Sequence, residues 1–147
     1  MTRRALAVAA TAAMLTGPDA GFAADGAQIF ASVCQACHQA GGVGTPGFAP
    51  PLVSEVLKNA GSRQKDYPVM VVAGGLTGAL ALADGSTITG AMPPQQALTD
   101  ADVAAVVNYI FRLNHATASV KSADVARVRA AIPSNADVKR LRQDLVK

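Results

Sequence analysis

The stretch Cys34-Gln35-Ala36-Cys37-His38 decides how the rest of the chain is interpreted. Two thiols separated by two residues on a helical turn match the separation of the two vinyl groups of a porphyrin. A histidine directly after the second thiol is held beneath the iron, which needs a nitrogen ligand on that face. The pattern is typical of covalent haem attachment. We therefore expect Cys34 and Cys37 to tether one haem c and His38 to be the proximal iron ligand.

Two other kinds of site share part of this pattern. A thioredoxin-like redox pair contains Cys-x-x-Cys, but it needs a βαβ pattern around it, and none is visible. Half of a zinc site needs a second pair of ligands at a suitable distance. The chain has two cysteines and two histidines in all, and the second histidine, His115, stands alone. Haem attachment is the favoured interpretation.

Length and composition are compatible with one domain built around a cofactor. The chain has 147 residues, of which 50% are hydrophobic and 4% aromatic, with no tryptophan. That length suits a single domain with its own core. A core short of large side chains gains apolar bulk from a buried porphyrin. We expect no enzyme activity of its own, because no nucleophile–base pair or carboxylate dyad is visible in the sequence.

The first residues read as a secretory signal. Arg3 and Arg4 form a positive start, and residues 5–15 are an alanine-rich apolar segment too short to span a bilayer. Residues 1–23 are therefore predicted to be a signal peptide, with the mature chain beginning near Ala24. We expect an exported, soluble protein of the bacterial periplasm that has no membrane anchor after the signal is cleaved.

Charge is unevenly distributed. Acidic residues outnumber basic ones between Ala24 and Phe111, whereas basic residues outnumber acidic ones from Arg112 onward. A basic tail can attract an acidic partner or simply keep a helical segment solvated, and the second interpretation is favoured. Nucleic acid is not an expected partner, because the tail lacks interleaved aromatic residues.

Hydrophobic periodicity predicts a mainly helical chain. The strongest helix opens at Thr99, whose side chain can cap the amide of Asp102 while the Asp102 carboxylate reaches back. This helix should cross the first one, where Gly26 and Phe30 let the two backbones approach. Ser54 and Asp66 are predicted to cap two shorter helices. The expected elements are helices over about 25–39, 53–60, 67–72, 100–114, 123–131 and 136–146, an apolar strap over 48–52, and a small hairpin or loop over 80–89.

An electron-transfer haem needs a second axial ligand, for which Met70, Met92, His115 and the lysines are candidates. Met92 is preferred because it sits between Gly90 and Pro93-Pro94, where a turned and stiffened loop would present its thioether. A soft thioether favours ferrous iron. Met70 lies among valines in a predicted helix and fits a core position better. His115 is more typical of a surface residue.

The strap before the second helix has a separate role. Prolines there block a helix, so its carbonyl groups stay free. A free carbonyl near the haem suits the second nitrogen of the proximal histidine. Pro50 and Leu52 are therefore predicted to belong to the haem surroundings.

Between Ala24 and Asn114 the chain resembles a class I, mitochondrial-type cytochrome c. The resemblance rests on the haem motif, on Pro50 or Pro51 ahead of Leu52, on Met92-Pro93-Pro94, and on Leu98-Thr99-Asp100 opening a helix that contains Tyr109. It implies an all-α fold of three to five helices around one haem, with methionine closing the iron. The stretch from Gly90 to Ile110 is closest to cytochrome domains that serve bacterial periplasmic dehydrogenases. The predicted division is a signal peptide (1–23), a cytochrome c domain (24–114) and a basic C-terminal helical extension (115–147).

These expectations describe a protein that carries one electron at a time between exported partners. A periplasmic dehydrogenase is the expected donor, and another cytochrome or a terminal oxidase the expected acceptor. Two alternatives stay open. The chain could be a tightly bound electron-accepting subunit of such a dehydrogenase, with the extension wrapping its partner. It could also be a peroxidase or gas-binding haem protein, which needs an open sixth position on the iron.

Overall fold

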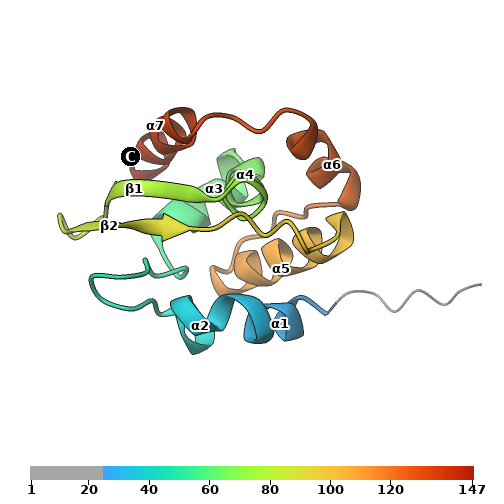
Figure 1. Ribbon diagram of the computed structural model, residues 1–147, viewed down its shortest axis with the longest axis horizontal. Helices are drawn as coiled ribbons and strands as arrows, with labels where there is room; N and C mark the ends of the chain where they lie inside the picture. Colours follow the sequence, from blue (N-terminus) through green and yellow to red (C-terminus); the bar gives the residue numbers. More distant parts are fainter. Residues whose placement is uncertain (1–24) are drawn as a thin grey trace, which may run out of the picture.

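The computed structural model describes residues 25–147, so the predicted signal peptide lies outside the described residues. The described chain is mostly helical with one small antiparallel sheet (Figure 1), which confirms the predicted fold class. None of the helices in this part of the chain combines the length and the apolarity needed to cross a membrane. In chain order the elements are α1 (Gly26–Ile29), η1 (Phe30–Cys34), α2 (Gln35–His38), η2 (Ala40–Gly42), α3 (Glu55–Arg63), α4 (Asp66–Gly74), β1 (Leu76–Ala81), β2 (Thr87–Met92), α5 (Asp100–Leu113), α6 (Ser122–Ala130) and α7 (Asn135–Val146).

The first predicted helix forms, but one of its turns is π-helical. The carboxylate of Asp25 accepts from the backbone N–H of Ala27 at 2.9 Å and caps the start of α1. In η1 the N–H of Gln35 donates to the carbonyl oxygen of Phe30, five residues earlier. Such turns insert one extra residue into a helix and occur frequently at functional sites. The haem motif thus begins inside a π-helical turn and continues through α2.

α1 and α5 cross in close contact, as predicted. A Cβ atom at Gly26 would collide with the backbone carbonyl of Ala105 on α5, so only glycine allows this approach. Beside the crossing the rings of Phe30 and Tyr109 lie 5.2 Å apart at a tilt of 50°. Tilted aromatic pairs at this distance stabilise a contact beyond simple burial.

α5 begins with the predicted capping box. The N–H of Asp102 donates to Oγ1 of Thr99 at 3.1 Å, and the N–H of Thr99 donates to Oδ2 of Asp102 at 2.9 Å. Both bonds satisfy amides that a helix start leaves without partners. The apolar stripe of this helix forms the centre of the core; its members are Val103, Val106, Val107, Ile110 and Phe111.

Two predicted helix boundaries were wrong. Ser54 caps α3 through its hydroxyl group, but the helix continues past Gly61 to Arg63. Glycine is suited to this interior position because a Cβ there would collide with the side chain of Ala116. Asp66 does not cap α4; it is the first helical residue, and its carboxylate accepts from Arg127 at 2.8 Å.

The hairpin is longer than predicted. β1 pairs with β2 from Leu76↔Met92 to Ala81↔Thr87, around a turn that contains Asp84-Gly85 as expected. Hydrophobic periodicity did not predict the ends of the strands that lie far from the turn, because glycine and alanine occupy much of both strands. Met92 is consequently the last residue of a strand and not part of a stiffened loop, which corrects the sequence prediction.

The C-terminal extension packs onto the rest of the chain. In Figure 1, α6 lies beside α4 and α5, and α7 lies beyond β1, where it also contacts α3. Three ion pairs fasten α6: Lys65 with Asp124 at 2.9 Å, Arg127 with Asp66 at 2.8 Å, and Arg129 with Asp100 at 3.1 Å. The sequence favoured a solvated tail, but α6 and α7 each have an apolar side that is buried. Their buried residues, which belong to the same core as α5, are Val125, Val128, Val138 and Leu145.

Candidate haem site

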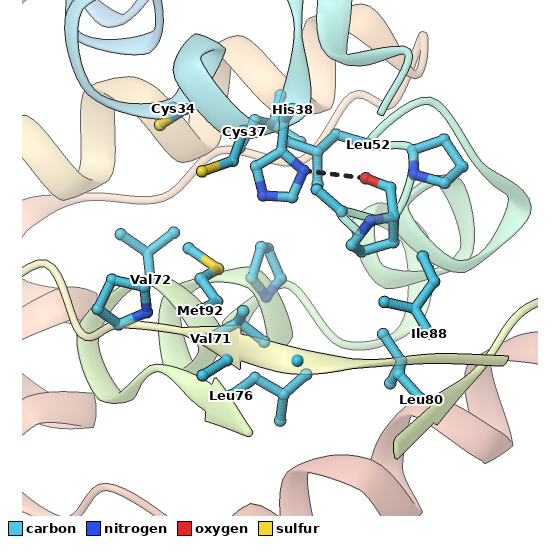
Figure 2. Close-up of a pocket in the computed structure, with 18 of the residues that line it drawn as sticks. Cys34, Cys37, His38, Leu52, Val71, Val72, Leu76, Leu80, Ile88 and Met92 are labelled. Carbon is cyan, nitrogen blue, oxygen red and sulfur yellow. Dashed lines mark hydrogen bonds between the residues drawn. The ribbon is translucent and has the colours of Figure 1, made fainter. Parts of the chain in front are cut away.

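A large apolar cavity opens between the helix that carries the Cys-x-x-Cys-His motif and the layer formed by α4 and the hairpin (Figure 2). The motif lines one wall, and the strap over 48–52 closes one side. The labelled apolar side chains around the cavity are Leu52, Val71, Val72, Leu76, Leu80 and Ile88. A cavity of this lining suits an apolar occupant.

One ring nitrogen of His38 is hydrogen-bonded to the strap. Its Nδ1 atom lies 2.9 Å from the carbonyl oxygen of Pro50, and the side chain is buried. A carbonyl only accepts, so Nδ1 carries the proton. Burial lowers the pKa of His38, although the bond to Pro50 partly opposes this. The neutral ring therefore offers an unprotonated Nε2, the form in which histidine binds a metal.

The two thiols lie beside the same cavity. They do not form a disulfide with each other; Cys34 is buried and Cys37 is exposed. Burial, and then the neighbouring Cys37, raise the pKa of Cys34 to about 11. Reactive Cys-x-x-Cys pairs of the thioredoxin type need a lowered thiol pKa, so this shift argues against that alternative.

The strap that carries Pro50 is fixed by a buried amide. The Nδ2 atom of Asn114 donates to the carbonyl oxygen of Leu52 at 2.7 Å, and its Oδ1 accepts from the N–H of Ser54 at 2.9 Å. The N–H of Leu52 donates to the carbonyl oxygen of Gly42 at 2.7 Å. These bonds set the position of the carbonyl group that orients His38.

Met92 faces the cavity from the wall opposite His38 (Figure 2). Its backbone is held on both sides. The strand that ends at Met92 is fixed by its pairing with Leu76. The prolines that follow lead to Gln95, whose N–H donates to the carbonyl oxygen of Val72 on α4 at 2.9 Å. The thioether therefore comes from a rigid strand end.

The other candidate iron ligands lie elsewhere. Met70 packs against the hydrophobic core from α4 and does not line the cavity. His115 is exposed just after α5. Pro50 and Leu52, predicted as haem surroundings, both line the cavity.

Three polar residues of the cavity wall, Tyr67, Gln95 and Arg142, were not predicted from the sequence. Tyr67 on α4 is buried, and its hydroxyl oxygen lies 3.3 Å from Nη1 of Arg142 on α7. Tyr67 and Arg142 are 75 positions apart, and nothing local in the sequence relates them. The sequence predicts Asn114 only as the end of a helix, although its amide can both donate and accept hydrogen bonds.

The arrangement fits a covalently bound haem. Two thiols flank an apolar cavity, and a neutral imidazole nitrogen and a thioether face each other across it. The zinc alternative finds no support, since within residues 25–147 no three His, Cys, Asp or Glu side chains gather as metal ligands would. All three functional residues of the motif, Cys34, Cys37 and His38, line this cavity.

Comparisons with known proteins agree with this geometry. The family model described as Cytochrome c matches residues 23–114. Two curated proteins named cytochrome c-552, both from Thermus thermophilus and one of them from a specified strain, are each 41% identical over an alignment of 90 residues that covers 59% of this chain. The matched region spans 66% of the first relative's length and 58% of the second's. Because the family model covers well over half of the sequence and the cavity carries the matching chemistry, the chain belongs to the cytochrome c family and binds haem c covalently.

Proposed function

We propose that this cytochrome carries single electrons between redox partners, with Cys34 and Cys37 tethering the haem and His38 and Met92 as the axial iron ligands. The haem supplies an iron that alternates between the ferric and ferrous states. The chain's own residues would hold that iron between His38 and Met92 and surround the group with apolar side chains.

One observation carries the proposal: His38 and Met92 face each other across the cavity from two rigid supports. Pro50 orients the imidazole. Strand pairing and the Gln95–Val72 bond hold the backbone around Met92. Two ligands fixed in advance keep the change in coordination between the two oxidation states small, which favours fast electron transfer. They also leave no open position for a peroxide or a gas.

We further propose that the protein works in the periplasm after its signal peptide is removed. A periplasmic dehydrogenase would donate the electron, and another cytochrome or a terminal oxidase would accept it. Phe48, which lines the cavity, is an apolar side chain that is 63% exposed. A small apolar rim suits the limited, short-lived contacts of electron-transfer partners.

A freely diffusing carrier is favoured over a fixed dehydrogenase subunit. The subunit hypothesis uses the extension to wrap a partner protein. Here α6 and α7 bury their apolar residues, among them Val125 and Leu145, against this chain's own core. Gel filtration of the exported protein should give a monomer; recovery in a stable complex with a catalytic subunit would reverse this preference.

Absorption spectra of the oxidised and reduced protein test the axial ligands. Thioether ligation gives the oxidised protein a weak far-red charge-transfer band, which Met92→Ala should abolish. Met70→Ala is the matched control and should retain the band, because Met70 does not line the cavity. Loss of the band in the control alone, or its survival in Met92→Ala, would refute the assignment. Rapid binding of carbon monoxide by the native reduced protein would indicate an open iron position instead.

A further inference from the structure

The extension contributes one charged side chain to the wall of the haem cavity. Arg142, on α7, lines the cavity although it lies outside residues 23–114, which the cytochrome c family model matches. It reaches the wall beside Tyr67 on α4, with 3.3 Å between Nη1 and the phenol oxygen. A guanidinium cation next to an apolar cavity is costly unless an anion or several acceptors face it.

Arg142 differs in this respect from the other arginines of the extension. Arg127 pairs with Asp66 at 2.8 Å, Arg129 with Asp100 at 3.1 Å, and Arg140 with Asp137. Within residues 25–147, no carboxylate lies within 4.0 Å of the Arg142 guanidinium. Its Nε atom is buried and has no hydrogen-bond partner in the described protein.

An unpaired buried donor on a permanently charged group calls for an acceptor that the protein itself does not supply. A buried donor left without a partner costs about 1–3 kcal/mol, and more when the group is charged. The haem brings two propionate carboxylates, which are anions with the planar geometry that a guanidinium matches. Tyr67 already receives one Nη group, so the remaining donors, Nε among them, are the ones available to a carboxylate.

We propose that Arg142 pairs with a haem propionate, with Tyr67 orienting the guanidinium. The inference rests on the haem that the family carries and not on the proposed partners or on Met92. Arg142 is then a positioning residue supplied by the extension. Its positive charge beside the ring also disfavours the additional positive charge of ferric iron, so it raises the reduction potential of the haem.

The first test is a spectroelectrochemical titration of the holoprotein. Arg142→Gln should shift the ferrous–ferric equilibrium about tenfold toward ferric, which corresponds to about 59 mV for one electron. Arg140→Gln is the matched control, since it removes the same charge from the same helix at a side chain that is 70% exposed. The control should shift the equilibrium less than about twofold, because exposed charges are screened. Equal shifts in the two variants would overturn the proposal.

The second test uses the unaltered holoprotein and does not depend on a variant that folds. Nuclear magnetic resonance on protein labelled with ¹⁵N-arginine should show a slowly exchanging Nε–H of Arg142 with cross-peaks to propionate methylene protons. Cross-peaks only to Tyr67, or rapid exchange with water, would overturn the pairing. The far-red band should persist in Arg142→Gln, so failure of this proposal can be distinguished from failure of Met92 ligation.

Discussion

Asn114 donates a hydrogen bond from Nδ2 to the carbonyl oxygen of Leu52, across 2.7 Å and 62 positions of sequence. The same amide group accepts from the N–H of Ser54 at 2.9 Å. One buried side chain at the end of α5 therefore fixes both the strap that orients His38 and the start of α3. The frame of the haem cavity depends on this residue.

Asn114→Ala should destabilise the protein, because it leaves the carbonyl of Leu52 and the amide of Ser54 without partners. Partly buried groups of this kind cost roughly 1–3 kcal/mol each when they are unpaired. The midpoint of denaturant unfolding measures the loss. Gln143→Ala, at an exposed position on α7, is the control and should unfold like the native protein. Equal midpoints for both variants would mean that the strap holds its place without Asn114.

Leu145→Ala tests whether the extension is part of the folded core. Leu145 is 2% exposed, and truncating a buried leucine typically costs about 2–5 kcal/mol. The adjacent Val146 is 45% exposed, so Val146→Ala should change the stability by no more than about 0.5 kcal/mol. Thermal unfolding of the two variants gives the comparison. A Leu145→Ala protein as stable as its neighbour would show that α7 contributes nothing to the core.

Asp124 makes the attachment of α6 sensitive to acid. The N–H of Lys121, then the side chains of Lys65 and Arg127, lower the pKa of this carboxyl from 3.8 to about 2. Its contribution to stability is therefore complete above about pH 4 and is lost as the pH falls toward about 2. Native protein should exceed Asp124→Asn in melting temperature at pH 6, and the difference should shrink over that acidic range.

The control for this acid effect is Asp144→Asn. Asp144 has an exposed side chain, and within residues 25–147 its one ion pair is with its helical neighbour Lys147 at 3.4 Å. Pairs of this kind contribute little to stability. A gap between native protein and Asp124→Asn that stays constant from pH 6 to pH 2 would contradict the assignment.

Gly26→Ala should force α1 away from α5. The new Cβ meets the backbone carbonyl of Ala105, which cannot rotate aside as a side chain would. Overpacking of this kind typically costs about 1–3 kcal/mol and sometimes more. Unfolding midpoints would reveal the effect. Full rescue by trimming Tyr109 to alanine would contradict this account, since the backbone obstacle at Ala105 remains.

Local patterns were the predictable part of this fold. The spacing of Cys34, Cys37 and His38 and the capping box of Thr99 and Asp102 depend on residues at most four positions apart. Periodicity also located the apolar stripe of α5. Hydrophobic periodicity did not predict the strand that ends at Met92, because the small residues in it have little preference for strand structure.

Contacts between distant segments were the part that could not be predicted. The sequence suggested a free carbonyl near Pro50 or Pro51, but only the folded strap identifies Pro50. Val125 and Val128 show helical spacing, yet nothing in the spacing says which surface they cover. Arg142 looks like any basic residue of a polar helix, and its place in the cavity wall depends on Tyr67, far away in the sequence.

The π-helical turn at Phe30–Cys34 accommodates one extra residue within the first helix. In a regular α-helix each residue advances the direction of its side chain by about 100°. Deleting one residue from this turn would restore regular geometry and leave Gly26 seated on α5. The wide turn absorbs its extra residue, so the imidazole of His38 would keep nearly its present direction toward the carbonyl of Pro50. Inserting a further residue would instead rotate His38 by about that angle. The segment should accordingly tolerate the loss of one residue from the turn but not the gain of one.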